Sequence, residues 1–128
     1  MNEVVYDAGA LLSIDRRQAA GGLMLHKERL ARGVRVCVPA AVAAQVVRDP
    51  ARQDPLMRAL RGCDVVAFGE DDYAPVGRLL AESGTSDVVE GFVALTAARR
   101  QATVITTDRA GIAALLGTLG APLPVLEP

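Results

Sequence analysis

The chain has 128 residues, of which 51% are hydrophobic and only 3% are aromatic, and its formal net charge is −1. The length predicts a single domain over residues 1–128, and the apolar content excludes a disordered chain. A net charge this small excludes a globally basic surface, so a nucleic-acid partner would have to be met by local groups.

Strand-like and helix-like patterns alternate along the sequence. In chain order they predict a strand at residues 3–6, helices at 8–14 and 18–32, a strand at 34–38, helices at 40–48 and 53–60, a strand at 64–68, helices at 71–82 and 86–100, a strand at 103–106, a helix at 109–119 and an edge strand at 122–126. Pro39 suits the first turn of the helix that follows it. The alternation is typical of a central parallel sheet of four to five strands with helices on both faces.

The helix at residues 18–32 has an amphipathic pattern. It places three leucines partly inward and three charged residues mostly outward (Leu23, Leu25 and Leu30; Lys27, Glu28 and Arg29). His26, on the same helix, is the one histidine of the sequence, and we interpret it as a surface or packing residue rather than a catalyst.

The two cysteines, Cys37 and Cys63, lie far apart and lack zinc-ligand spacing. They predict reduced, buried thiols in a cytoplasmic protein. No signal-peptide pattern is present, and no apolar run approaches the roughly 20 residues that span a bilayer, so we expect no membrane association.

Two aspartates stand where predicted buried strands end. Asp7 directly follows Val4-Val5-Tyr6, and Asp108 follows the strand at residues 103–106. The carboxyl ends of parallel strands meet at one edge of a sheet, which is where ligands bind in open α/β folds. We therefore expect these two carboxylates to share a site.

A second pair of acids opens the apolar helix at residues 86–100. Asp87 and Glu90 are spaced i and i+3 and so share a helix face. Carboxylates converging with Asp7 and Asp108 would repel one another, and a hard divalent cation such as Mg²⁺ or Mn²⁺ removes that repulsion. Such a site can activate water against a phosphodiester, which is nuclease chemistry that needs no His, Cys or Lys.

Each acid also has a simpler explanation as a helix cap. Asp87 with Glu90 matches a capping box, and Asp7 and Asp108 can each cap the helix that follows. Other acid-based enzymes fit less well, because the late lysine of a phosphoacceptor receiver and the Asp-x-Asp of a haloacid-dehalogenase-type phosphatase are missing. The sequence also has no Gly-x-x-x-x-Gly-Lys loop and no Gly-x-Ser-x-Gly elbow.

The whole chain resembles the PIN-domain family, the fold of VapC-type toxins. The resemblance is carried by residues 4–12 (VVYDAGALL), 38–46 (VPAAVAAQV), 85–94 (TSDVVEGFVA) and 104–108 (VITTD), in this order and spacing. It implies a three-layer α/β/α sandwich and cleavage of RNA that depends on Mg²⁺ or Mn²⁺. It also implies a homodimer and a small antitoxin that covers the site.

Carried over residue by residue, the resemblance makes Asp7 the first acidic metal ligand and Asp108 the acid after the last central strand. The helix acid of the family matches Glu90, with Asp87 as an additional acid one turn earlier. Thr107 or Thr106 would be a polar neighbour of the site.

The chain departs from the family pattern at two positions. Gln45 stands where the family usually has Glu, and its carbonyl can coordinate or hydrogen-bond but brings no charge. Glu90 stands where Asp is commoner, and its extra methylene moves the carboxylate. Two hypotheses follow: an endoribonuclease that is the toxin of a type II toxin–antitoxin pair, and a catalytically impaired module that binds RNA or protein. Three arginines are candidates for contacts with RNA phosphates, but a surface role in solubility is the favoured interpretation (Arg16, Arg48 and Arg109).

Overall fold

The computed structural model describes residues 2–15 and 20–128. In this part of the chain the strands are β1 (Glu3–Tyr6), β2 (Arg35–Pro39), β3 (Asp64–Val66), β4 (Thr103–Ile105) and β5 (Val125–Leu126). The α-helices are α1 (Ala8–Asp15), α2 (Ala20–Ala31), α3 (Ala40–Val46), α4 (Asp54–Arg61), α5 (Tyr73–Ser83), α6 (Val88–Arg100) and α7 (Arg109–Thr118). A 3₁₀ turn, η1 (Pro50–Arg52), precedes α4.

The five strands form one parallel sheet in the order β3-β2-β1-β4-β5. The central strand β1 consists of apolar residues because both of its faces are covered, and Val4, Val5 and Tyr6 are fully buried. Tyr6 pairs with Ile105 of β4, so the residues that follow, Asp7 and Thr106, leave the sheet side by side. This pairing confirms the predicted parallel sheet and its strand count.

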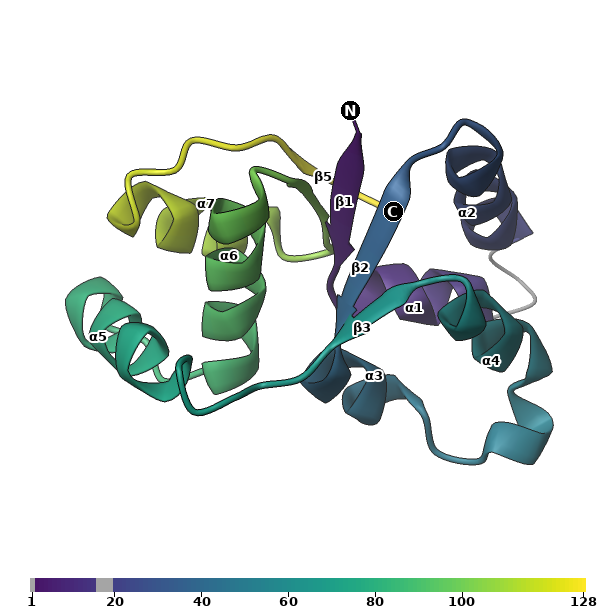
Figure 1. The fold of residues 1–128 in the computed structure, drawn as a ribbon, viewed down its shortest axis with the longest axis horizontal. Helices are drawn as coiled ribbons and strands as arrows, with labels where there is room; N and C mark the ends of the chain where they lie inside the picture. The colour runs from purple at the N-terminus through teal and green to yellow at the C-terminus, as the bar shows by residue number, and fades with distance from the viewer. Residues whose placement is uncertain (1, 16–19) are drawn as a thin grey trace.

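Helices cover both faces of the sheet and complete the three-layer sandwich (Figure 1). On one face α6 crosses β1, β2 and β4, and α5 and α7 pack against α6. On the other face α1 packs against α2, α3 and α4. The chain passes from β1 to β2 on one side and from β4 to β5 on the other, so the boundary between β1 and β4 is a topological switch point. In open α/β sheets the crevice at that point is the usual ligand site.

At the end of the sheet where the strands begin, two acidic side chains form ion pairs with one arginine. Arg100, the last residue of α6, donates from Nη1 to Glu3 at 2.6 Å and to Asp64 at 2.9 Å. This pair of contacts ties α6 to the beginning of β1 and to the edge strand β3.

Several predicted boundaries shift for identifiable reasons. Pro39 closes β2 and precedes α3, so its expected place in the first turn of that helix is wrong. The helix α3 ends at Val46 rather than at residue 48, because Val47 is extended (φ −70°, ψ 120°). The predicted helix at residues 18–32 includes positions outside the described residues, and α2 begins at Ala20. Both β3 and β5 are shorter than expected.

The leucines of α2 lie partly inward, as predicted, because Leu25 is 40% and Leu30 is 39% exposed, whereas His26 is buried. The His26 ring is held inward because its Nδ1 lies 2.8 Å from the hydroxyl of Tyr6, and Arg29 reaches the same hydroxyl at 3.0 Å. His26 is therefore a packing residue, and Arg29 is half-buried rather than fully outward.

Both cysteines are free thiols, as expected. Cys37 is buried and Cys63 is half-buried, and burial raises the pKa of Cys37 to about 11 and that of Cys63 to about 12. Among residues 2–15 and 20–128, no helix has both the length and the apolar character that crossing a membrane requires.

Candidate acidic site

Asp7 is fixed at the end of β1 by three hydrogen bonds. Its amide donates to the Ile105 carbonyl at 3.0 Å, which extends the β1–β4 ladder by one residue. Oδ1 accepts from the Ala8 amide at 2.8 Å, and Oδ2 accepts from the Thr106 hydroxyl at 2.8 Å. The side chain is almost fully buried, so these contacts leave it little freedom to rotate.

Asp108 lies just beyond the end of β4 and begins α7. Its Oδ1 accepts from the Gly111 amide at 3.1 Å, which is a helix N-cap, and its own amide donates to the Thr106 hydroxyl at 3.0 Å. The Thr106 hydroxyl therefore holds Asp7 and Asp108 at the same time, donating to one and accepting from the other.

Asp87 and Glu90 are placed by the first turn of α6. Asp87 is the N-cap, and its Oδ1 accepts from the Glu90 amide at 3.0 Å. Asp87 is exposed, whereas Glu90 is half-buried. The capping explanation thus holds for Asp87 and Asp108, and it coexists with their place beside the other acids.

The four acids meet around Glu90. The pKa of Glu90 is raised to about 7, first by burial, then by the hydrogen bond and charge of the Asp108 carboxyl group, and last by the charges of Asp87 and Asp7. No Lys, Arg or His among the described residues forms an ion pair with any of the four. The predicted set is therefore brought together at the switch point with uncompensated negative charge.

The four acidic side chains are not arranged as a preformed metal-binding site. Within the described residues, no three His, Cys, Asp or Glu side chains are grouped so that they could hold a metal ion. The hydrogen bonds give a physical reason: both oxygens of Asp7, and one oxygen each of Asp87 and Asp108, accept from protein donors. A bound cation would have to use the lone pairs that these hydrogen bonds leave free.

The chemistry of the donors nevertheless fits a hard divalent cation. All four groups offer carboxylate oxygens, the ligands that Mg²⁺ and Mn²⁺ prefer. Gly111 leaves room for the capping carboxylate, because a Cβ at this position would lie 2.2 Å from Oδ2 of Asp108. Only glycine leaves that carboxylate in its present place.

The threonine that contacts the acids is Thr106 rather than Thr107. Thr107 is exposed, and it lies against the start of α1, where a Cβ on Gly9 would be 2.5 Å from its Cγ2. The register between β1 and β4 distinguishes the two threonines. Because Tyr6 pairs with Ile105, the next residue of β4's chain, Thr106, lies opposite Asp7. The sequence alone shows two threonines but not this register.

The other residues that the sequence proposed for the site are exposed or lie outside the described residues. Gln45 is exposed on α3, the helix that follows the neighbouring strand β2. Arg48 donates to the carbonyls of Ala44 and Val47 at 2.7 and 3.1 Å, so it caps the end of α3. Arg109 is exposed at the start of α7, and Arg16 lies outside the described residues.

Comparison with known proteins supports the architecture. No model of a known protein family matches the chain, and no curated protein sequence does. A solved structure, that of VapBC2 from Rickettsia felis bound to a DNA fragment from their promoter, is similar with a TM-score of 0.67. The similarity covers 98% of this chain and 98% of the other at 14% sequence identity, so it establishes a shared fold.

Proposed function

We propose that the protein is an endoribonuclease that depends on Mg²⁺ or Mn²⁺. The observation that carries the proposal is the meeting of Asp7, Glu90 and Asp108, with Asp87 beside them, where β1 and β4 end. The pKa of Glu90 is raised first by burial and then by the neighbouring acids, and a divalent cation would relieve the repulsion among these carboxylates.

In this proposal Asp7, Asp108 and Glu90 hold the ion, and Asp87 is an additional ligand. When bound, the ion would lower the pKa of a water molecule and stabilise charge on phosphate oxygens. Thr106 keeps Asp7 and Asp108 at a fixed separation by bonding to both. In the metal-free protein the pKa of Glu90 is about 7, so near neutral pH a cation that binds there would displace its proton.

We further propose that the chain is the toxin of a toxin–antitoxin pair and forms a homodimer. The toxin role draws on the fold shared with the VapBC2 structure and on the motifs that resemble VapC-type toxins. For the dimer, exposed apolar side chains near the edge strand β3 and the start of α5 offer a surface (Val65, Phe68 and Tyr73). Light scattering of the purified chain measures its oligomeric state directly.

A catalytically impaired RNA- or protein-binding module is the second candidate. Two observations favour it: Gln45 stands where the family pattern has Glu, and the described acids are not preassembled around an ion position. Such a module would bind a partner without cutting RNA.

Cleavage of a mixed RNA pool by the purified protein separates the two candidates. The nuclease proposal expects cleavage with Mn²⁺ that stops in excess chelator and in Asp7→Asn, but continues in Asp71→Asn, a matched change at an exposed acid. Cleavage that persists in Asp7→Asn would overturn the site assignment. Absence of cleavage, together with no Mn²⁺ binding by calorimetry, would favour the module.

A further inference from the structure

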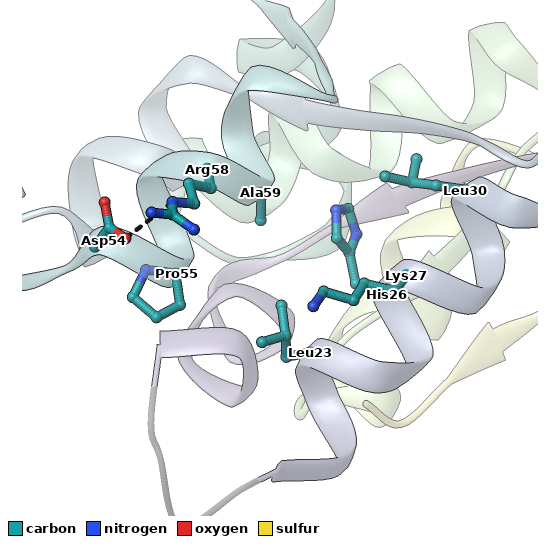
Figure 2. A pocket seen from close by; sticks show the side chains of 8 residues that line it. All are labelled: Leu23, His26, Lys27, Leu30, Asp54, Pro55, Arg58 and Ala59. Atoms are coloured by element: carbon teal, nitrogen blue, oxygen red, sulfur yellow. Dashed lines mark ion pairs between the residues drawn. The ribbon is translucent and has the colours of Figure 1, made fainter.

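A cavity of about 260 Å³ opens between α2 and α4, away from the acidic site (Figure 2). Its apolar walls come from both helices, and the polar groups at its edge are charged (walls Leu23, Leu30, Pro55 and Ala59; charged groups Lys27, Asp54 and Arg58). The volume suits a ligand smaller than a typical drug molecule, whose sites span roughly 300–1,000 Å³.

His26 supplies a polar group that has no partner. The residue is 2% exposed and lines this cavity, yet its Nε2 has no hydrogen-bond partner among the described residues. The Ala59 carbonyl is near enough to raise the pKa of His26, but it makes no hydrogen bond of ordinary geometry with Nε2. A buried polar atom left unpaired needs an explanation, and a ligand is one.

The hydrogen bonds of Tyr6 define which tautomer His26 adopts. Arg29 can only donate, so the Tyr6 oxygen accepts from it at 3.0 Å and is free to donate its own hydrogen to His26 Nδ1 at 2.8 Å. The proton of the neutral ring then sits on Nε2, which becomes a hydrogen-bond donor. The opposite tautomer would in addition leave the hydroxyl hydrogen of Tyr6 unpaired.

The ring stays neutral under ordinary conditions. Burial lowers the pKa of His26, and the Arg29 charge lowers it further. The positive charge at the cavity therefore comes from its edge. Arg58 is paired with Asp54 at 2.9 Å, whereas Lys27 forms no ion pair with the described residues, and Figure 2 shows its ammonium extending into the space between the helices.

We propose that this cavity binds a small organic carboxylate with an apolar body, such as an aromatic or branched aliphatic acid. One carboxylate oxygen accepts from His26 Nε2, the charge faces the Lys27 ammonium, and the apolar body lies against Leu23, Leu30 and Pro55. The site is independent of the acidic site and of the proposed nuclease activity.

Titration of the full chain with benzoate, followed by calorimetry and by NMR of the imidazole nitrogens, tests the proposal. Because the sequence has one histidine, its ring signals need no assignment. Before titration, we expect a protonated Nε2 and an unprotonated Nδ1. Benzoate should then shift the Nε2 signal with a dissociation constant of about 1 mM, and benzyl alcohol, a neutral probe of similar shape, should bind about tenfold more weakly.

Two exposed variants complete the test without disturbing the core. Lys27→Met should weaken benzoate binding about tenfold, whereas Arg61→Met, which removes a positive charge on α4 outside the cavity, should leave it unchanged. The proposal is overturned if wild-type protein shows no Nε2 shift with benzoate, if the two variants bind equally well, or if the proton is found on Nδ1.

Discussion

The hydroxyl of Thr106 donates a 2.8 Å hydrogen bond to Oδ2 of Asp7, a residue 99 positions earlier in the chain. The same oxygen accepts from the amide of Asp108 at 3.0 Å, so one side chain sets the spacing of the two strand-end acids. The precision of the proposed metal site therefore depends on a residue that carries no charge.

Thr106→Val keeps the shape of the side chain and removes both of its hydrogen bonds. We expect Mn²⁺ affinity to fall about 10- to 100-fold, the usual effect of losing a group that orients a ligand. The buried carboxylate of Asp7 loses a donor and the amide of Asp108 loses its acceptor, which together should cost about 1–3 kcal/mol of unfolding free energy. Calorimetry and urea denaturation measure the two effects. Thr118→Val, at an exposed position on α7, is the control and should change neither.

Glu90 should make the metal-free protein less stable as the pH rises. Its pKa is about 7 in the folded chain against an ordinary value of 4.5, so between these values the folded state binds more protons than the unfolded state. Its stabilising contribution is thus complete below about pH 4.5 and is lost as the pH passes about 7.

Glu90→Gln removes this dependence. In urea denaturation at the two ends of that range, the variant should gain stability relative to wild type at the higher pH, on the order of 1 kcal/mol after allowing for solvent screening. Glu82→Gln, an exposed change on α5, should show no such gain. Parallel pH profiles for wild type and Glu90→Gln would contradict the raised pKa.

Gly111→Ala should damage the acidic site more than the fold. The new Cβ would lie 2.2 Å from Oδ2 of Asp108, so the carboxylate must rotate away. We expect Mn²⁺ affinity to fall at least about tenfold, with stability changed by no more than about 1 kcal/mol, because the better helix propensity of alanine offsets the weakened cap. On the same helix, Gly117→Ala meets nothing within 4 Å and should leave Mn²⁺ affinity intact.

Gly22→Ala should destabilise the packing of α2 on α1. A Cβ at Gly22 would lie 2.4 Å from the backbone carbonyl oxygen of Ser13, which cannot move without shifting the helix. We expect a loss of about 1–3 kcal/mol in thermal or urea unfolding. The neighbouring Gly21→Ala has open space and should be neutral or slightly stabilising, and equal effects at the two positions would contradict the close helix contact.

Gln45→Glu tests whether the departure from the family pattern weakens the site. If α3 contributes a ligand, the added charge should raise Mn²⁺ affinity about tenfold and increase cleavage of RNA. Gln101→Glu, an exposed change at the end of α6, is the matched control. No change in Mn²⁺ affinity with Gln45→Glu would remove α3 from the proposed site.

The sequence was sufficient for the architecture and for the position of the acids. Residue patterns such as Val4-Val5-Tyr6-Asp7 predict a buried strand with an acid at its end, and the parallel sheet then fixes which edge the acid occupies. The pattern could not separate Thr106 from Thr107, because that choice depends on the pairing register between β1 and β4.

The sequence also did not show how deeply His26 is buried. Helical periodicity places Leu25 and Leu30 partly inward, but it does not single out His26, which is buried and hydrogen-bonded to Tyr6. A single long-range polar contact of this kind leaves no trace in local hydrophobic spacing.

The Arg100 contacts with Glu3 and Asp64 give the sheet an electrical asymmetry. At the end where the strands begin, Glu3 and Asp64 share one internal cation, Arg100. Where β1 and β4 end, Asp7, Glu90 and Asp108 have no ion-pair partner among the described residues. If a cation binds there, as we propose, relief of the repulsion among these carboxylates would contribute to its binding energy.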